Sequence, residues 1–475
     1  MKSLKDALVD YDLALLQGIA DRRGLDPPAN RNPETLSQFC DALLSPVMIA
    51  FFLEDITAEE KEALLQLIAA GNQLESQPFS RQYGEIRSMG PGRLRREKPW
   101  QHPQNVAESL WYQGLIFKGF QHTINGPQEV IFIPDELQLN LPFIPHEAPS
   151  FQLHIASAPK FVLANHLPVK EDMFTFLVYL HTNIVRLTQD DEIPADQVAE
   201  LLGQYSQIGL EEIEFADRWQ SFILHLARRL NFLAKQGQRL KLNVQVVRDW
   251  LQKSSWQQIG DLQNTWRSDP TWNDLWHAPG LYPKATGWEN SPLLARSKIL
   301  HYLSQLPSGE WFSIRHFQQA LKKTEPDFQR PNGDYQSWYI YDAQGEPLMG
   351  FDHWDKVEGG LIHYILTTIL GGFGVVELGA PAERVPATLF RITPFGESFL
   401  LPDTPYVEPE IKRPPVLGVN AATFTIRVPN EASLYDRFQL ARFAQLHRRE
   451  EKRMLYKITR ESYLKALEQS ISLEQ

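Results

Sequence analysis

The segment Leu115-Ile-Phe-Lys-Gly-Phe120 is followed by Asn125-Gly126 and then by Glu129-Val-Ile-Phe-Ile133. Asn-Gly is the strongest short-range signal for a two-residue hairpin turn, because both residues tolerate the positive φ that this turn requires. The runs on either side are rich in β-branched and aromatic residues, which favour strands. This stretch therefore predicts a β-hairpin over residues 115–133.

The residues before the hairpin predict helices. Thr57-Ala-Glu-Glu60 has the pattern of a capping box, which places a helix start at Thr57. Apolar residues then recur at helical spacing until Gly71, a residue type that commonly ends helices. Two shorter helical segments are expected over residues 79–83 and 105–113. Three helices followed by a hairpin are the order of a winged helix, so we predict one over residues 56–139.

A similar order recurs over residues 286–402. Ser291-Pro292 predicts a helix start, with serine at the N-cap and proline in the first turn. Gly371-Gly372 is expected to end the third helix of this set. We therefore predict a further winged helix, with helices over 314–321 and 357–370, strands over 374–378 and 387–392, and a polar insertion over 326–355.

The remaining segments have less specific patterns. Residues 1–55 are expected to form short helices, with Pro46 ending or kinking a helix over residues 36–44. Residues 169–285 have mainly helical apolar periodicity, and we predict a second, winged-helix-like unit there. Proline-rich linkers are expected over residues 140–168 and 403–415.

Residues 416–475 predict a small α/β domain. We expect a strand over residues 423–428, a helix over 433–449, a strand over 455–458 and a last helix capped by Thr459. No end signal follows before Gln475, so this domain is expected to be truncated. The predicted fold class is mainly α with small β-wings (α+β), made of tandem winged-helix modules and this C-terminal domain.

Composition restricts the setting and the partners. The chain has 475 residues, too many for one ordinary core, and its 43% hydrophobic content is that of globular domains. Its single cysteine, Cys40, excludes an intrachain disulfide and fits a reducing compartment, and its helical context predicts a buried side chain. No apolar run reaches the roughly 20 residues that span a bilayer. We expect a cytoplasmic protein without a membrane partner.

The sequence contains no motif that would assign catalysis. There is no phosphate-binding G-x-x-x-x-G-K-[ST], no G-x-S-x-G and no H-E-x-x-H. The acidic cluster Asp352-His353-Trp-Asp355 allows two readings, a metal site or a cap at the start of the next helix, and the helix dipole favours the cap. We therefore predict no catalytic residue, no metal and no cofactor.

Basic residues carry the functional prediction. Because the formal net charge is −11, any nucleic-acid contact must use local basic patches. Arginine suits such contacts, since its planar guanidinium binds phosphate through two hydrogen bonds. The basic residues fall into three groups along the sequence, and the third and weakest consists of Arg228, Arg229, Lys235, Arg239 and Lys241. For each group, the alternative is that its residues lie on a helix face exposed to solvent. The predicted nucleic-acid-binding residues are Arg87, Arg93, Arg95, Arg96, Lys98, Arg228, Arg229, Arg442, Arg448, Arg449, Lys452 and Arg453.

Several segments together resemble a known family. They include Met89-Gly-Pro-Gly-Arg-Leu-Arg-Arg-Glu-Lys-Pro-Trp100, Glu108-Ser-Leu-Trp-Tyr-Gln-Gly-Leu-Ile116, Phe424-Thr-Ile-Arg-Val-Pro429 and Tyr456-Lys-Ile-Thr-Arg-Glu-Ser-Tyr-Leu-Lys-Ala-Leu467. The chain is similar to bacterial helicase-associated proteins that carry a domain like the amino-terminal region of XPB-type DNA helicases. The resemblance implies tandem winged helices, that terminal domain and a role on DNA. The helicase motor itself has no counterpart here, so helicase activity does not carry over.

Two functions therefore remain open at this stage. The first is a non-catalytic nucleic-acid-binding protein, with DNA as the expected ligand, that acts in a DNA transaction or in transcription. The alternative is a protein–protein adaptor or scaffold subunit of a helicase, nuclease or defence complex.

Overall fold

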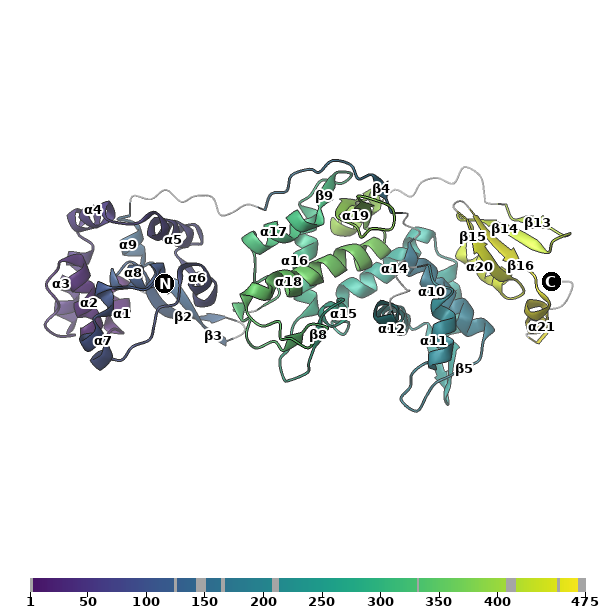
Figure 1. Cartoon of the computed structure of the whole chain (residues 1–475), viewed down its shortest axis with the longest axis horizontal. Helices are drawn as coiled ribbons and strands as arrows, with labels where there is room; N and C mark the ends of the chain where they lie inside the picture. Colours follow the sequence, from purple (N-terminus) through teal and green to yellow (C-terminus); the bar gives the residue numbers. More distant parts are fainter. Residues whose placement is uncertain are drawn as a thin grey trace. The chain divides into compact units, whose positions relative to one another are not determined.

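The computed structural model describes residues 3–123, 126–141, 151–163, 167–206, 213–330, 333–406, 416–450 and 453–468. The chain divides into two compact units, one formed by Met1–Phe151 with Lys322–Tyr335 and the other by Gln152–Leu321 with Gln336–Gln475. Each consists of helices with small antiparallel sheets, which confirms the predicted class of mainly α with small β elements (Figure 1). Within the described residues, every helix is too short or too polar to cross a membrane.

The first unit opens with four short helices, as the sequence predicts. They are α1 (Leu4–Val9), α2 (Leu13–Arg23), α3 (Pro33–Leu43) and α4 (Pro46–Glu54). Gly24 ends α2 in the left-handed conformation with φ 62°. Pro46 neither ends nor kinks a helix, because α3 has already ended and Pro46 is the first residue of α4, where a missing N–H costs nothing. Cys40 is buried, as predicted.

A set of six elements follows, which we call module 1 (residues 58–132). It comprises α5 (Ala58–Ala69), β1 (Gln73–Glu75), α6 (Ser76–Tyr83), α8 (Val106–Tyr112), β2 (Phe117–Thr123) and β3 (Gly126–Phe132), and α7 (Pro91–Glu97) with a 3-10 turn at Pro99–Gln101 is inserted between α6 and α8. Both hydrogen bonds of the predicted capping box are present between Thr57 and Glu60. The predicted hairpin is β2 paired with β3, and β1, which the sequence does not predict, pairs with β3 to give the order β1-β3-β2.

The second unit repeats this order of elements twice. Module 2 (residues 168–242) has α10 (Pro168–Thr182), β5 (Val185–Arg186), α11 (Ala195–Leu202), α12 (Ile213–Arg229), β6 (Leu233–Gln236) and β7 (Arg239–Leu242). Module 3 (residues 292–392) has α16 (Pro292–Ser304), β9 (Trp311–Ser313), α17 (Ile314–Thr324), α18 (Trp354–Tyr364), β11 (Val376–Ala380) and β12 (Leu389–Ile392). The short strand β10 (Ile340–Tyr341) and a 3-10 turn at Phe351–His353 are inserted before α18, and a π-helix over Ile365–Leu370 continues it. In both modules the first strand pairs with the last, in the orders β5-β7-β6 and β9-β12-β11.

Part of the proline-rich segment before module 2 belongs to a sheet. Strand β4 (Phe161–Val162) pairs with β11, and the Ala156 amide donates to the carbonyl of Trp311 on β9. Module 2 is followed by α13 (Val244–Leu251), α14 (Ser255–Ser268) and α15 (Asp274–His277), and module 3 by α19 (Pro394–Leu400). Thr393 caps α19 by accepting from the Gly396 amide, as expected for a strand-to-helix turn.

The last part is the C-terminal module (residues 416–468). It comprises β13 (Gly418–Asn420), β14 (Thr425–Pro429), α20 (Leu434–Ala441), β15 (Gln445–Arg449), β16 (Arg453–Lys457) and α21 (Arg460–Glu468). The sheet order is β13-β14-β16-β15. The helix predicted over residues 433–449 is wrong beyond Ala441, because residues 445–449 pair with β16 as a strand. Arg, Gln and Leu favour helices locally, and strand pairing overrides that preference.

Candidate nucleic-acid interface

In the predicted winged helices, the third helix is the element expected to enter a DNA groove, and α8, α12 and α18 hold that place in the three modules. In α8, every residue from Ala107 to Tyr112 is buried. The N-terminal helices cover it, and the Trp111 indole N–H donates to the Tyr11 hydroxyl at 2.7 Å. In module 3 no residue from Val357 to Leu370 is exposed. A helix without an exposed polar face cannot read base edges. Any nucleic-acid contact by module 1 must therefore use elements other than α8, whereas α18 of module 3 is exposed only at Asp355 and Lys356 in its first turn.

The third helix of module 2 has an exposed face of mixed charge. Glu214 and Asp217 are exposed near the start of α12, and Arg228 and Arg229 are exposed at its end. The Arg229 Nε lies 3.6 Å from the carboxylate of Asp269. Phosphate would be repelled at the start of this helix and attracted at its end, so the two predicted arginines can contribute only from the C-terminal turn.

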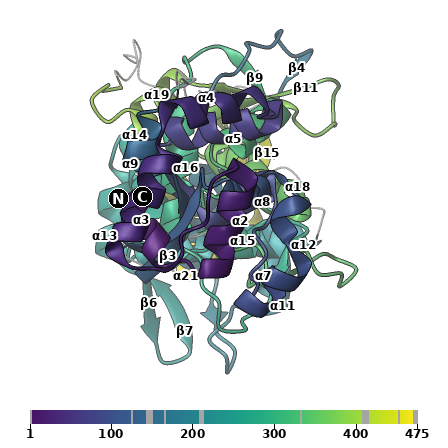
Figure 2. The ribbon, with the colours of Figure 1, turned by 90° about the vertical axis from the view of Figure 1, so that its left-hand side faces the viewer.

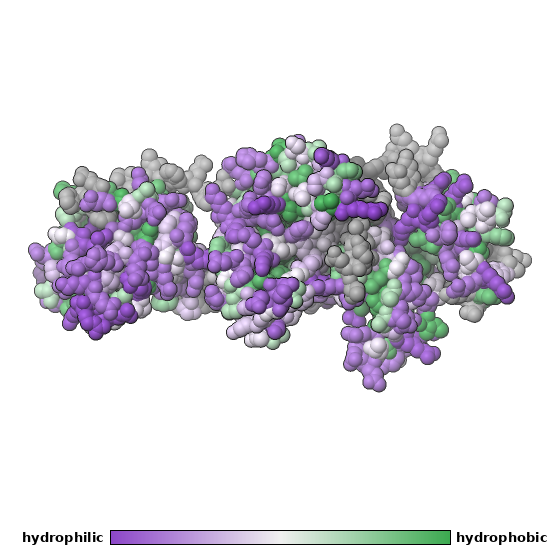
Figure 3. Space-filling view, in the orientation of Figure 1, coloured by the Kyte–Doolittle hydropathy of each residue, from purple (hydrophilic) through white to green (hydrophobic). Residues whose placement is uncertain are grey.

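Four predicted residues lie together on the exposed helix α7 (Pro91–Glu97) or at its end, in the first unit. Arg93, Arg95, Arg96 and Lys98 are all exposed, and the surface over α7 is strongly hydrophilic (Figure 3). Glu97 accepts from Arg93 at 3.0 Å and from Arg96 at 3.4 Å. Within the described residues, Arg95 and Lys98 have no ion-pair partner. Exposed pairs of this kind are weak, so this group retains positive charge for a ligand.

Arg87 belongs to the same stretch of sequence but has a different role. Its side chain donates to both carboxylate oxygens of Glu108, at 2.5 and 2.7 Å. Glu108 is completely buried and also accepts from the Gln104 amide at 3.0 Å. Burial opposes the ionisation of Glu108, but these hydrogen bonds lower its pKa overall. Arg87 therefore neutralises a buried carboxylate, and it is not a free cation for phosphate.

The predicted arginines of the C-terminal module lie on two faces of its sheet. Strand alternation places Arg449 on the inner face, where it contacts the Glu171 carboxylate of α10 at 3.0 Å. Arg442 follows α20 and donates to Gln439 at 2.9 Å. Arg448 and Arg453 are exposed on the opposite face, and Lys452 lies outside the described residues. Of the described members of this group, Arg448 and Arg453 are therefore the ones exposed on the sheet surface.

The outer sheet face, defined as Arg427, Arg448, Arg453 and Lys457, brings together four cations from three strands of the C-terminal module. In the strand register, Arg427 and Arg448 both lie opposite Leu455. All four cations are exposed, whereas the alternate residues of β14 and β16 are buried. The Glu450 carboxylate accepts from Arg453 at 2.6 Å and also from Arg448, and the two arginines lower its pKa. In the part of the chain that the structure describes, Arg427 and Lys457 have no carboxylate partner.

Arg427 and Lys457 are not among the nucleic-acid-binding residues predicted from the sequence. The signal that could have found them is the period-two alternation in Thr425-Ile-Arg-Val-Pro429 and in Arg453-Met-Leu-Tyr-Lys457, which places the cations on one side of adjacent strands. Counting basic residues along the chain does not detect this arrangement, because Arg427 is distant in sequence from the other three.

A buried ion pair attaches the C-terminal module to module 2. The guanidinium of Arg437 on α20 donates to both oxygens of Glu171 on α10, at 2.9 and 2.7 Å. Arg437 is 1% exposed and Glu171 is 8% exposed. Burial opposes the ionisation of both groups, but their attraction lowers the pKa of Glu171 and raises that of Arg437. This pair holds α20 against α10, and thereby the outer sheet face in a defined orientation to module 2.

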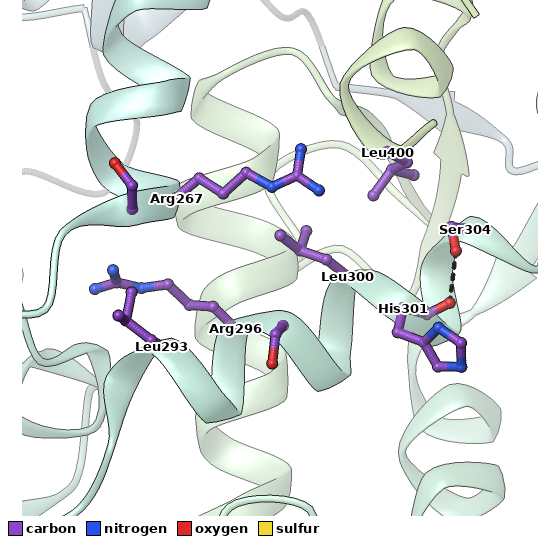
Figure 4. Close-up of a pocket in the computed structure, with 9 residues that line it drawn as sticks. Arg267, Leu293, Arg296, Leu300, His301, Ser304 and Leu400 are labelled. Atoms are coloured by element: carbon purple, nitrogen blue, oxygen red, sulfur yellow. Dashed lines mark hydrogen bonds between the residues drawn. The ribbon is translucent and has the colours of Figure 1, made fainter. Parts of the chain in front are cut away.

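A cavity of about 520 Å³ lies between α14, α16 and the end of α19 (Figure 4). Its polar side chains are used internally: Arg296 donates to Asp274, Arg267 to the Phe399 carbonyl at 2.7 Å, and Ser304 to the His301 carbonyl at 2.7 Å. Side chains that donate hydrogen bonds within the protein in this way do not form a nucleophile–base pair. The cavity therefore provides no support for catalysis.

The acidic cluster before α18 shows helix-start geometry. Asp352 and His353 form a single turn of 3-10 helix, and Asp355 lies in the first turn of α18. The His353 Nδ1 lies 2.7 Å from the Met349 carbonyl oxygen. No group of three or more potential metal ligands occurs among the described residues.

Comparison with protein-family models and with curated proteins finds no match for this chain.

Proposed function

We propose that this chain is a non-catalytic nucleic-acid-binding protein that holds the phosphate backbone with the outer sheet face of its C-terminal module. The observation that carries the proposal is that Arg427 and Lys457 stand exposed and without carboxylate partners, among the described residues, beside Arg448 and Arg453. The chain as a whole carries a formal charge of −11, so this concentration of cations opposes its overall charge. Phosphate is the ligand whose charge matches such a surface.

The three repeated modules support the proposal through their connectivity. Helix, strand, helix, helix, strand, strand, with the first strand paired to the last, is the element order we assign to winged helices. Because α8 is buried and α18 exposes only the opposite charges Asp355 and Lys356, we propose that the modules act as a scaffold and that contacts to phosphate, rather than to base edges, hold the nucleic acid. Such contacts position a protein without reading sequence. The resemblance to helicase-associated proteins favours DNA, and the single buried Cys40 fits a cytoplasmic setting.

The test is a fluorescence-anisotropy titration of the full chain with a labelled duplex of about 20 base pairs, at about 50 and 200 mM salt. Each phosphate contact contributes about 0.9 to the slope of log affinity against log salt, which is roughly eightfold in affinity at about 0.1 M salt. The Arg427→Gln/Lys457→Gln variant should therefore bind roughly 60-fold more weakly and lower the slope by about 2.

The matched control is Arg460→Gln, which removes an exposed cation from α21 of the same module but not from its sheet. It should stay within about twofold of the unchanged chain. Absence of duplex binding at the lower salt, or an equal loss in the control and the double variant, would contradict the proposal. A labelled single strand of the same length shows which form of nucleic acid is preferred.

A second function, a protein–protein adaptor, is favoured by a separate observation. Strand β13 is an edge of its sheet, and Val416 and Val419 on or beside it are 79% and 73% exposed. Open apolar edge strands pair readily with a strand from another chain. A subunit of a helicase, nuclease or defence complex that stays bound after nuclease treatment, and is released by Val419→Lys, would support this role. A partner lost on nuclease treatment alone would favour nucleic acid.

A further inference from the structure

Two arginines face each other across neighbouring strands of module 2. In the antiparallel pairing of β5 with β7, Arg186 lies directly opposite Arg239. Lys241 lies two residues further along β7, and therefore on the same face of the sheet. Arg186 and Arg239 are exposed and Lys241 is half-buried. Three cations from two strands thus share one face, which we call the wing face (Arg186, Arg239 and Lys241).

The opposite face of these strands anchors the wing. Val185 is 0% exposed and Leu240, its cross-strand partner, is 7% exposed. Their burial fixes the strand register, so the two arginines cannot separate by a slip of the strands. The hairpin of β6 and β7 projects beyond the helices of its module (Figure 2). The wing face is thereby both preorganised and accessible.

Charge compensation of the wing face is incomplete. Lys241 donates to the amide oxygen of Gln236, which leaves its charge in place. Asp191, in the loop after β5, pairs with Lys235, whose side chain alternates to the other face. Among the residues described, Arg186 and Arg239 have no ion-pair partner. Like charges directly opposite each other on antiparallel strands, with Cβ atoms about 5 Å apart, destabilise a sheet. A bound anion would remove this repulsion.

We propose that the wing face is a second phosphate-binding site, which takes a phosphodiester of the same nucleic acid. This inference rests on the proposed function and deepens it. Two adjacent guanidinium groups can each donate two hydrogen bonds to phosphate oxygens, and Lys241 adds a third positive charge. The nucleic acid then contacts module 2 and the C-terminal module together, which the buried Arg437–Glu171 pair holds against each other.

The experiment compares Arg186→Gln and Arg239→Gln with Lys235→Gln in the duplex titration. Lys235 is the matched control because it lies on the same hairpin, carries the same charge and points to the other face. Each arginine variant should bind roughly eightfold more weakly at about 0.1 M salt and lower the salt slope by about 1. Lys235→Gln should stay within about twofold. Equal losses in all three variants, or none in the arginine variants, overturn the inference.

The outer-sheet variant separates failure of this inference from failure of the proposed function. If Arg427→Gln/Lys457→Gln weakens binding and the wing variants do not, the proposed function stands and the wing site is wrong. If the unchanged chain binds no duplex, both are wrong. Capture by anionic lipid vesicles without duplex binding overturns both as well.

A measurement without ligand tests the physical premise. Removing one of two repelling charges should raise the melting temperature of Arg239→Gln by about 1 °C at low salt, and the gain should vanish at high salt, where the repulsion is screened. Lys235→Gln should lower it or leave it unchanged, because it breaks a pair. A lower melting temperature for Arg239→Gln at low salt means that Arg239 has a structural partner, and it overturns the inference.

Discussion

Replacing Arg437 by methionine should release the C-terminal module from α10. The guanidinium carries two hydrogen bonds to Glu171 and lies 4.4 Å from the ring centroid of Phe174. Removing one partner of a buried ion pair leaves an uncompensated charge and costs about 3–5 kcal/mol. Arg449 and Lys170 remain at 3.0 and 4.0 Å from Glu171 and retain part of its compensation. We therefore expect a loss of about 2–4 kcal/mol for Arg437→Met.

Hydrogen exchange measures this loss where it occurs. Some amides of α20 exchange only when the module detaches from α10. A loss of about 2–4 kcal/mol raises the equilibrium constant for detachment by about 30- to 1,000-fold, so these amides should exchange faster by the same factor. The matched control is Arg448→Met, whose side chain is 64% exposed on the outer sheet face of the same module. Its exchange should change by less than about threefold.

A double variant tests the cause of the loss. Because the penalty comes from an orphaned charge, Arg437→Met/Glu171→Met should recover stability relative to Arg437→Met alone. If Arg437→Met leaves the exchange of α20 unchanged, the pair does not hold the module. If the double variant is less stable than both single variants, attraction between the two charges is a large net stabilisation and the orphaned-charge explanation is refuted.

Two further predictions concern stability. A Cβ at Gly396 would clash with the Val375 carbonyl oxygen. Gly396→Ala should therefore destabilise module 3 by more than about 2 kcal/mol in a denaturant titration. The control is Gly260→Ala on α14, where a Cβ meets open space, and it should be neutral or slightly stabilising. Burial raises the pKa of Asp172 to about 6, although Ser206 and Trp219 donate to it. The folded state then binds the proton more tightly than the unfolded state. The free energy of unfolding should therefore rise by about 1 kcal/mol as the pH falls from 7 to 5. If the Asp172→Asn variant keeps the pH dependence of the unchanged chain, this explanation is wrong.

Local signals in the sequence identified many elements of the fold. The hairpin of β2 and β3 and the helix start at Thr57 each depend on a few neighbouring residues, and both are present. The predicted turn residue Asn125 lies outside the described residues. Strand β15 was missed because its residues favour a helix locally and become a strand only by pairing with β16. The first strands of the modules were missed because each has only two or three residues, which is too short to show an alternating pattern.

The candidate site was harder to predict than the fold, because the role of an arginine depends on partners that are distant in sequence. Arg87 is committed to Glu108, and Arg437 is committed to Glu171, which lies 266 positions away. No periodicity within one segment indicates such a pairing. Counting basic residues along the sequence locates segments rich in positive charge. It cannot distinguish cations that neutralise buried carboxylates from cations that remain exposed.

Strand alternation determines which cations of the sheets stay exposed, and this gives the proposed function its physical basis. On β14 and β16 each buried residue is followed by one that points outward, so a sheet with a fixed core must present Arg427 and Lys457 together. The same constraint presents Arg186 opposite Arg239. Neither arrangement stabilises the folded chain by itself, since like charges held side by side repel. Such a surface destabilises the free protein, and a ligand of opposite charge that neutralises it would account for its presence. A phosphate backbone supplies negative charge at regular intervals along its length.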